Sequence, residues 1–275
     1  MEPEADDRSS WESGSRIECR CSIESAARAS FRFYAELNDH LPPGQRHRTV
    51  EQDFFVPASV KDMIEGFGVP HTEVDLVLVN GESSDFSRLV QNGDRVAVYP
   101  VFESLDITPE LRVRPQPLRD PRFLLDVHLG RLAAYLRMLG FDAVCENRAT
   151  DAELVRISSE QKRILLTRDR GLLKHSAVTH GYWVRQTDSR RQTTEIVKRF
   201  DLGRNIRPFT RCMECNELLN MASKEEVWSR IPPRIAAHCD EFQQCARCKR
   251  VYWQRSHYRR MRRWIGELAP GSSVP

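Results

Sequence analysis

Four cysteines in the last third of the chain form two Cys-x-x-Cys pairs, Cys212 with Cys215 and Cys245 with Cys248. Two such pairs supply four thiolates, which is the complete ligand set of a tetrahedral structural zinc site. A redox role needs only one pair, and a closed set of four leaves no open position for catalysis. The spacing therefore predicts a zinc ribbon with a structural Zn²⁺, and the 29 residues between the pairs must hold additional structure.

The other four cysteines have no evident pairing in the sequence. We expect them to be free thiols in a reducing compartment, and Cys239 to be a bystander of the zinc site. They are Cys19, Cys21, Cys145 and Cys239.

Three aspartates upstream of the cysteines form a second candidate constellation. Asp126 ends the apolar run that begins at Phe123, Asp169 follows the apolar run that ends at Thr167, and Asp151 begins the intervening helix. Ligands of a parallel α/β sheet bind beyond the carboxyl ends of its strands, so the three side chains can meet at one edge. Clustered carboxylates repel one another unless a cation neutralises them. The pattern therefore predicts a Mg²⁺ or Mn²⁺ site of the kind that activates water for phosphodiester hydrolysis.

Each of these acids also has a purely structural interpretation. Asp151 is equally placed to be an N-terminal helix acid, and Asp169 to be a turn residue. Asp126 is harder to explain in that way, because an acid within an apolar run is costly unless its charge is used. His128 is a phosphate-facing candidate or a solvent-facing residue at a helix start. A haloacid-dehalogenase-like phosphatase would have Asp at that position, and no glycine-rich phosphate loop follows the strand.

The elements that must position these residues fall into two larger units. Residues 122–203 alternate strand and helix, which predicts a mainly parallel sheet with helices on both faces. Residues 17–104 have the order β-β-α-β-β of a β-grasp, with strands over 30–37, 49–56, 75–81 and 94–100 and a helix over 60–67.

The composition of the remaining segments indicates which of them are folded, which are disordered and which is a linker. The apolar fraction of 40% and charged fraction of 29% are those of a globular protein. We expect residues 1–16 and 266–275 to be disordered, 105–121 to be a proline-stiffened linker, and 204–265 to hold the ribbon and a basic C-terminal helix. Without a membrane-length apolar run or a signal peptide, the sequence predicts a cytoplasmic protein.

The basic C-terminal segment interleaves arginines with aromatic residues. Arginines neutralise phosphates and aromatic rings stack on unpaired bases, so this segment is a nucleic-acid candidate. The alternative is an amphipathic helix that packs Tyr258, Met261 and Trp264 onto the domain, and both interpretations can hold together. The predicted nucleic-acid-binding residues are Arg168, Arg170, Arg255, Arg259, Arg260 and Arg263.

Residues 123–264 resemble the ribonuclease domain family named after the C-terminal region of the mut-seven exonuclease. The resemblance is carried by Phe123-Leu-Leu-Asp-Val-His-Leu-Gly-Arg-Leu-Ala, Leu165-Leu-Thr-Arg-Asp-Arg-Gly-Leu-Leu, Thr210-Arg-Cys-Met-Glu-Cys-Asn and Val251-Tyr-Trp-Gln-Arg-Ser-His. It implies a PIN-like fold followed by a zinc ribbon, with Asp126, Asp151 and Asp169 as metal-binding acids. Glu153 would be able to share the role of Asp151, and Asp188 is either a fourth acid or a helix N-cap.

The N-terminal unit resembles ubiquitin-related sulfur carriers, through Val79-Asn-Gly and Asn92-Gly-Asp-Arg-Val-Ala-Val-Tyr-Pro. Sulfur carriers end in a free Gly-Gly tail, whereas this chain continues through Val101-Phe-Glu-Ser. The departure disfavours a carrier and favours a docking or regulatory module for a protein partner.

The leading functional hypothesis is a Mg²⁺- or Mn²⁺-dependent ribonuclease that acts on single-stranded or structured small RNA. The alternative is a catalytically silent RNA-binding or adaptor protein with the same domains. Convergence of the carboxylates within metal-bridging distance would discriminate the two.

Overall fold

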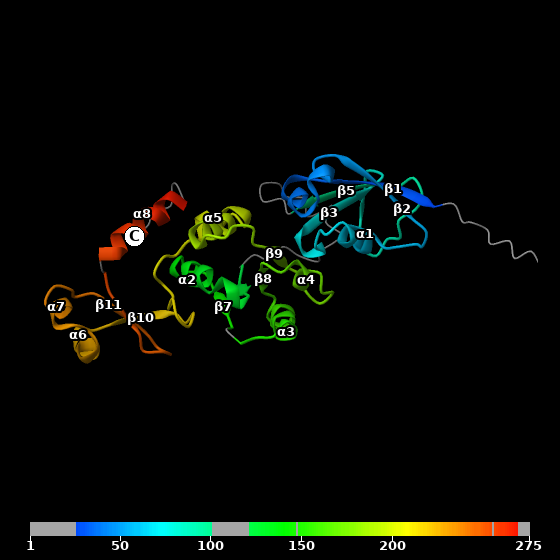
Figure 1. Ribbon diagram of the computed structural model, residues 1–275. Coiled ribbons are helices and arrows are strands. Elements are labelled where there is room, and N and C mark those ends of the chain that lie inside the picture. The colour runs from blue at the N-terminus through cyan, green and yellow to red at the C-terminus, as the bar shows by residue number, and fades with distance from the viewer. Residues whose placement is uncertain (1–25, 101–120, 147, 255, 269–275) are drawn as a thin grey trace, which may run out of the picture.

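The computed structural model describes residues 26–100, 121–146, 148–254 and 256–268. They form a β-grasp unit, a parallel-sheet unit and a four-cysteine module (residues 206–254), followed by a C-terminal helix, α8 (Ser256–Leu268) (Figure 1). The expected disordered N-terminus, most of the expected linker, Cys19, Cys21 and Arg255 lie outside the described residues. No helix within these ranges is long and apolar enough to cross a membrane.

The β-grasp unit is a five-stranded sheet in the order β2-β1-β5-β3-β4 with one helix packed against it. The N-terminal strand β1 runs parallel to the last strand β5, and the other neighbouring pairs are antiparallel. The elements are β1 (Ala27–Phe33), β2 (Thr49–Phe54), α1 (Val60–Gly66), β3 (Val74–Val79), β4 (Glu82–Ser84) and β5 (Arg95–Pro100).

The first strand begins before the expected 30–37 and ends four residues earlier than expected, because the chain turns sharply after Phe33. Ala35 takes a left-handed backbone conformation, and a 3-10 helix follows over Ala35–His40. The buried amide of Asn38 donates hydrogen bonds to the carbonyl oxygens of Phe33 and Ala35, which fixes the turn. Apolar alternation predicts a strand here, but a side-chain amide that binds the backbone ends it.

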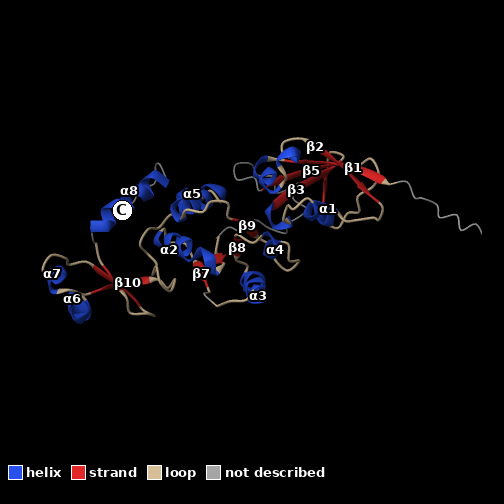
Figure 2. Cartoon of the chain, viewed as in Figure 1, coloured by secondary structure: helices blue, strands red, loops and turns tan. Residues whose placement is uncertain are grey.

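The second unit has the predicted architecture: a parallel sheet, in the order β7-β6-β8-β9, with helices on both faces (Figure 2). The elements are β6 (Phe123–Leu125), α2 (Gly130–Met138), β7 (Ala143–Cys145), α3 (Asp151–Gln161), β8 (Ile164–Thr167), α4 (Arg170–Leu173), β9 (Gly181–Trp183) and α5 (Ser189–Arg199). Phe123 and Leu125 pack with α2 and α5, whereas Leu124 points to the opposite face and packs with α3 and α4. Alternate side chains of a strand point to opposite faces, so an uninterrupted apolar run fits a strand buried on both sides.

The four-cysteine module is a three-stranded antiparallel sheet in the order β10-β11-β12. The long interval between the cysteine pairs holds two short helices, as the spacing required. The elements are β10 (Leu219–Ala222), α6 (Lys224–Val227), α7 (Pro233–Ala236), β11 (Phe242–Cys245) and β12 (Val251–Tyr252).

Helix α8 leaves this module and packs against the parallel-sheet unit, beside α5 in Figure 1. Ile265 is fully buried in the same apolar core as α2 and α5, and Met261 and Trp264 pack at its margin. The Trp264 ring lies 5.2 Å from that of Tyr135, and the Tyr258 ring 4.6 Å from that of Phe209. The packing interpretation of the tail aromatics is therefore confirmed.

The β-grasp unit docks on strand β9 through buried charged groups. The carboxylate of Glu73 is almost wholly buried, and it accepts hydrogen bonds from the backbone N–H of Trp183 (2.5 Å) and from Arg185 (3.0 Å). His40 Nε2 lies 2.9 Å from the same carboxylate. Burial raises the pKa of Glu73, but the His40 hydrogen bond and the charge of Arg185 outweigh it, so the pKa lies below its ordinary value. A buried carboxylate with this many donors fixes the two units to each other.

The four-cysteine module covers the opposite edge of the parallel sheet. Asn216 accepts a hydrogen bond from the backbone N–H of Ala143 (3.0 Å), and Arg137 donates one to the Ala143 carbonyl oxygen (2.7 Å). Arg137 also donates to the carbonyl oxygens of Met213 and Glu214, which ties α2 to the first cysteine pair. Gly140 makes the approach possible, because a Cβ at this position would collide with the carbonyl oxygen of Arg207.

Candidate active site and metal centre

The carboxyl edge of the parallel sheet, where its strands end, carries the predicted acids. Asp126 follows β6, Asp169 follows β8, and α3 begins with Asp151 after β7. Strand β6 lies between β7 and β8, so all three residues emerge from neighbouring positions of the same edge. The order of the strands therefore places the three residues along the same carboxyl edge of the sheet, as the sequence predicts.

Thr167 links two of these acids directly. Its buried hydroxyl donates to Asp126 Oδ2 (3.0 Å) and accepts a hydrogen bond from the backbone N–H of Asp169 (2.9 Å). The Asp169 carboxylate in turn accepts from the backbone N–H of Gly171 (2.7 Å) and caps α4. One hydroxyl thus sets the orientation of Asp126 and the backbone position of Asp169.

Asp151 is exposed at the first position of α3, and its side chain makes no hydrogen bond with the described residues. Glu153 stabilises the start of the helix, because its carboxylate accepts from the backbone N–H of Thr150 (2.8 Å), while the Thr150 hydroxyl accepts from the Glu153 N–H. This reciprocal pair is a capping box. Hydrogen bonds from the Thr150 N–H and hydroxyl lower the pKa of Glu153.

The carboxylates are not gathered around one point. Among the described residues, the four cysteines are the one group of three or more His, Cys, Asp or Glu side chains that lie close enough to hold a single ion. Asp126, Asp151 and Asp169 share the carboxyl edge without forming a second such group.

Two further side chains of this edge do not belong to the predicted set. Cys145 ends β7, and its thiol lies 3.7 Å from the carbonyl oxygen of Asp126. Burial raises the pKa of Cys145, and the charges of Asp126 and Glu146 raise it further. Glu146 directly follows β7 and is therefore another carboxylate at this edge, and its position after a strand is the signal that could have found it.

Of the two remaining candidates, Asp188 caps a helix and His128 is exposed. Asp188 is the N-cap of α5 and accepts hydrogen bonds from the N–H groups of Arg190 and Arg191. His128 is exposed in a short 3-10 helix, Val127–Leu129.

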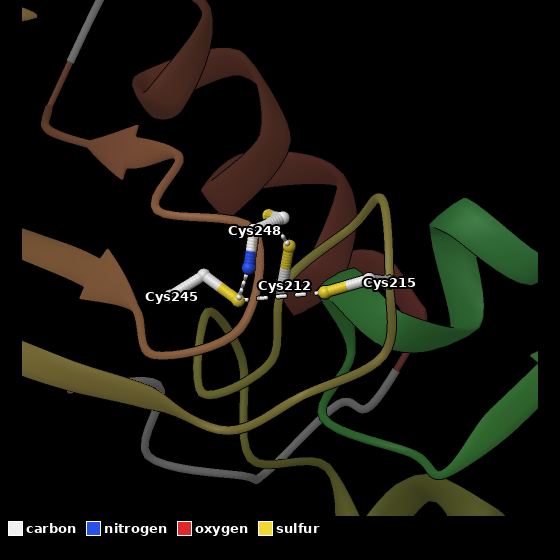
Figure 3. Close-up of side chains that lie close together, drawn as sticks. All are labelled: Cys212, Cys215, Cys245 and Cys248. Carbon is white, nitrogen blue, oxygen red and sulfur yellow. Dashed lines mark hydrogen bonds between the residues drawn. The ribbon is translucent and has the colours of Figure 1, made fainter.

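The four cysteines converge from two similar turns (Figure 3). Their sulfur atoms all lie within 4.8 Å of one another, and two of the separations are 3.4 and 3.5 Å. Zn–S bonds of about 2.3 Å in a tetrahedron place the sulfurs about 3.8 Å apart, so the geometry fits a zinc ion. The two turns are closed by equivalent backbone hydrogen bonds. The Asn216 N–H donates to the Cys212 carbonyl oxygen, and the Lys249 N–H donates to the Cys245 carbonyl oxygen, both at 3.0 Å. Cys239 lies outside the group.

The Tyr252 hydroxyl supports this centre from β12. It lies 3.2 Å from Cys212 Sγ and accepts a hydrogen bond from the Met213 N–H (3.1 Å). Burial opposes ionisation of Cys212, but hydrogen bonds from Tyr252 and from backbone N–H groups outweigh it and lower its pKa to about 6. The chain thus favours the thiolate, the form that binds a metal, at Cys212, whereas burial raises the pKa of Cys215 and Cys248.

The two arginines that flank Asp169 are engaged within the protein. Arg168 donates to the carbonyl oxygens of Val184, Arg185 and Gln186 at 2.8 to 3.2 Å. Arg170 lies over the Trp183 ring (4.9 Å) and donates to the carbonyl oxygen of His40 in the β-grasp unit (3.4 Å). Of the predicted tail cations, Arg259, Arg260 and Arg263 are exposed on α8.

Comparisons with known proteins agree with both halves of the sequence interpretation. A family model described as Mut7-C RNAse domain matches residues 121–265, and one described as Mut7-C ubiquitin matches residues 26–106. A crystal structure of small archaeal modifier protein 1 from Haloferax volcanii is 22% identical over 28% of this chain and 99% of its own, with a TM-score of 0.23. A second crystal structure of that modifier is 20% identical with the same coverage and TM-score. No curated protein matches the chain.

Proposed function

Because this chain belongs to the Mut7-C RNAse domain family, we propose that it is a metal-dependent ribonuclease that hydrolyses RNA phosphodiester bonds at the carboxyl edge of its parallel sheet. The observation that carries the proposal is the Asp126–Thr167–Asp169 arrangement within the region that the family model matches. One buried hydroxyl binds the carboxylate of Asp126 and the backbone N–H of Asp169, so it positions two acids at the same edge of the sheet.

Asp126 and Asp169 would hold a Mg²⁺ or Mn²⁺ ion, with Asp151 or Glu146 as the third acid. Such an ion, when bound, supplies a polarised water and neutralises charge on the scissile phosphate. Thr167 orients Asp126 by occupying Oδ2, and the Gly171 N–H orients Asp169 by occupying Oδ1. Each carboxylate retains a second oxygen, and carboxylate oxygens are the ligands that Mg²⁺ prefers.

The four cysteines would hold a structural zinc ion, as their closed set of sulfurs requires. This ion would keep the four-cysteine module folded and would take no part in hydrolysis. The module and α8 would then supply RNA-binding surface to the adjacent sheet.

The test is cleavage of single-stranded and structured RNA by wild type, Asp126→Asn and Asp169→Asn, with Mg²⁺, Mn²⁺ or neither. We expect metal-dependent cleavage by wild type and a loss of at least a hundredfold in each variant. The matched control is Asp53→Asn, an equal change of charge on the exposed surface of β2, which should cleave like wild type. Equal cleavage by all four proteins would exclude the assigned acids.

A catalytically silent RNA-binding protein is the second candidate. It is favoured by the separation of the three aspartates and by the engagement of Arg168 and Arg170 within the fold. RNA binding by wild type, without cleavage under any of the metal conditions, would establish this alternative.

A further inference from the structure

Three hollows adjoin one another where the parallel-sheet unit, the four-cysteine module and α8 meet. The central one has a volume of about 380 Å³, and its neighbours have about 460 and 510 Å³. The central hollow shares Arg211 with the first neighbour, and it shares Tyr252, Trp253, Tyr258 and Met261 with the second. The three hollows are therefore neighbours, and we call the line that they form the path.

The central hollow is predominantly apolar and aromatic. Four aromatic rings that are not fully buried contribute to its wall, together with four methionines, and its charged residues are Arg211, Arg262 and Glu241. Its size falls in the range of pockets that hold a small planar molecule. Aromatic rings stack on any nucleobase, and methionines adapt to its outline. The rings are those of Phe209, Tyr252, Trp253 and Tyr258.

The hollow on one side of it is strongly basic. It contains Arg122, Arg204, Arg207 and Arg211, with Asp142 as its one acid. Asp142 is already bound by Arg163 (2.8 Å) and Asn216 (2.7 Å), and these hydrogen bonds lower its pKa against the opposing effect of burial. Arg204 and Arg207 are exposed, and their side chains make no hydrogen bond or ion pair with the described residues.

The hollow on the other side is basic as well. Arg230, Lys249 and Arg250 line it, and no acid does. Arg250 pairs with Glu214 at 3.0 Å, but both side chains are more than half exposed, so the pair is weak.

The path thus places cations, then aromatic rings, then cations. We propose that it holds an unpaired segment of an RNA strand, with one or more bases in the central hollow and the flanking phosphates against Arg204 and Arg207 on one side and Arg230 and Lys249 on the other. The choice of RNA rests on the proposed function. This path is separate from the proposed active site. It begins at the amino ends of β6 and β7, opposite the carboxyl edge that holds Asp126 and Asp169.

The test measures binding of a fluorescent 12-nucleotide oligouridylate by anisotropy, in full-length Asp126→Asn to prevent cleavage. Two double variants are added to this background, Arg204→Gln/Arg207→Gln and Arg230→Gln/Lys249→Gln. The matched control is Arg48→Gln/Arg95→Gln, which removes the same charge from exposed positions of the β-grasp unit. Zinc content by native mass spectrometry and circular dichroism verify that each protein is folded.

We expect each double variant to bind roughly tenfold more weakly at 0.1 M salt and to lower the slope of log K against log salt by about 1.4, since a phosphate contact on a single strand contributes about 0.7. The control should bind like its parent. Double variants that bind as tightly as the control would overturn the proposal.

A second measurement addresses the bases. An oligonucleotide with three abasic positions at its centre should bind about fivefold more weakly or worse, and uridine monophosphate should compete only at far higher concentration. Equal binding of the abasic strand would refute base stacking, and equal competition by the mononucleotide would identify a nucleotide site in place of a strand path.

The binding and cleavage experiments together distinguish failure of the proposed path from failure of the proposed ribonuclease activity. Loss of binding in the double variants, with no cleavage by wild type, would support the path and reject the ribonuclease. Normal binding in the double variants, with normal wild-type cleavage, would reject the path alone.

Discussion

The hydroxyl of Thr167 is a single group on which the proposed active site depends. Thr167→Val keeps the shape of the side chain but removes the hydrogen bonds to Asp126 and Asp169. We expect single-turnover cleavage to fall about 10- to 100-fold, as when a partner of a metal ligand is removed, with a stability loss of about 1–3 kcal/mol. Thr167→Ser retains the hydroxyl and should retain most of the activity. A valine variant as active as wild type would show that the bridge has no catalytic role.

The first turn of α3 holds both a proposed third acid, Asp151, and the acid of the capping box, Glu153. Asp151→Asn removes an exposed charge from the first position of the helix, so it should lower cleavage strongly at an unchanged melting temperature if Asp151 is the third acid. Glu153→Gln retains the acceptor of the capping box and should change cleavage less than about twofold. Parallel assays of rate and melting temperature discriminate the two, and a larger catalytic loss in Glu153→Gln would transfer the role to that residue.

At the scale of elements, the strands of the four-cysteine module are short, and we expect the module to depend on a metal ion held by the four sulfur atoms. Cys245→Ser should therefore remove the bound zinc and increase hydrogen exchange across β10, β11 and β12, because a structural zinc supplies much of the folding free energy of so small a unit. Exchange in the β-grasp unit should be unchanged. Cys239→Ser is the control, since this thiol lies outside the group. Persistent protection of the metal-free module would refute a structural zinc.

Elements with strong local signals were predictable from the sequence, and two short elements without such a signal were not. The apolar runs that end at Leu125 and Thr167 specify buried parallel strands, and Thr150 with Glu153 specifies the start of α3. Strand β4 and helix α4 have three and four residues, too few for periodicity to register. The family, the β-grasp and the cysteine group were all predicted and confirmed.

The sequence does not predict which side chains of distant elements contact one another in the fold. Thr167 reads as an ordinary strand end, and nothing local indicates that its hydroxyl reaches Asp126, 41 residues earlier. Arg168 and Arg170 resemble free cations in the sequence, yet both are engaged by carbonyl groups that only the folded chain brings near. Contacts of this kind depend on packing between elements, which composition and spacing do not encode.

At the scale of the whole molecule, Glu73 makes the docking of the β-grasp unit sensitive to acid. Its folded-state pKa lies below its ordinary value of 4.5, so its contribution to stability is complete above that pH and is lost as the pH falls through the folded-state pKa. We expect the radius of gyration from small-angle scattering to increase below about pH 4.5 as the two units separate.

Glu73→Gln tests the same interface at neutral pH. Removal of one partner of a buried ion pair should lower the free energy of unfolding by about 3–5 kcal/mol. The free energy of unfolding of the variant should also change less with pH in the acid range. Asp39→Asn is the control, because Asp39 pairs with the same Arg185 from an exposed position and should cost less than about 1 kcal/mol. Equal effects of the two substitutions would contradict a special role for the buried carboxylate.

The hydrogen bonds at the two sides of the parallel sheet also bear on solubility. Strand β9 is an outer strand, and its outward-facing N–H at Trp183 is taken by Glu73, while the outward-facing groups of Ala143 on β7 are taken by Asn216 and Arg137. Unpaired strand borders recruit other chains and seed aggregates. The β-grasp unit and the four-cysteine module thus cover the two outer strands of the sheet, and we expect a fragment trimmed to 121–200, which would lose both, to self-associate.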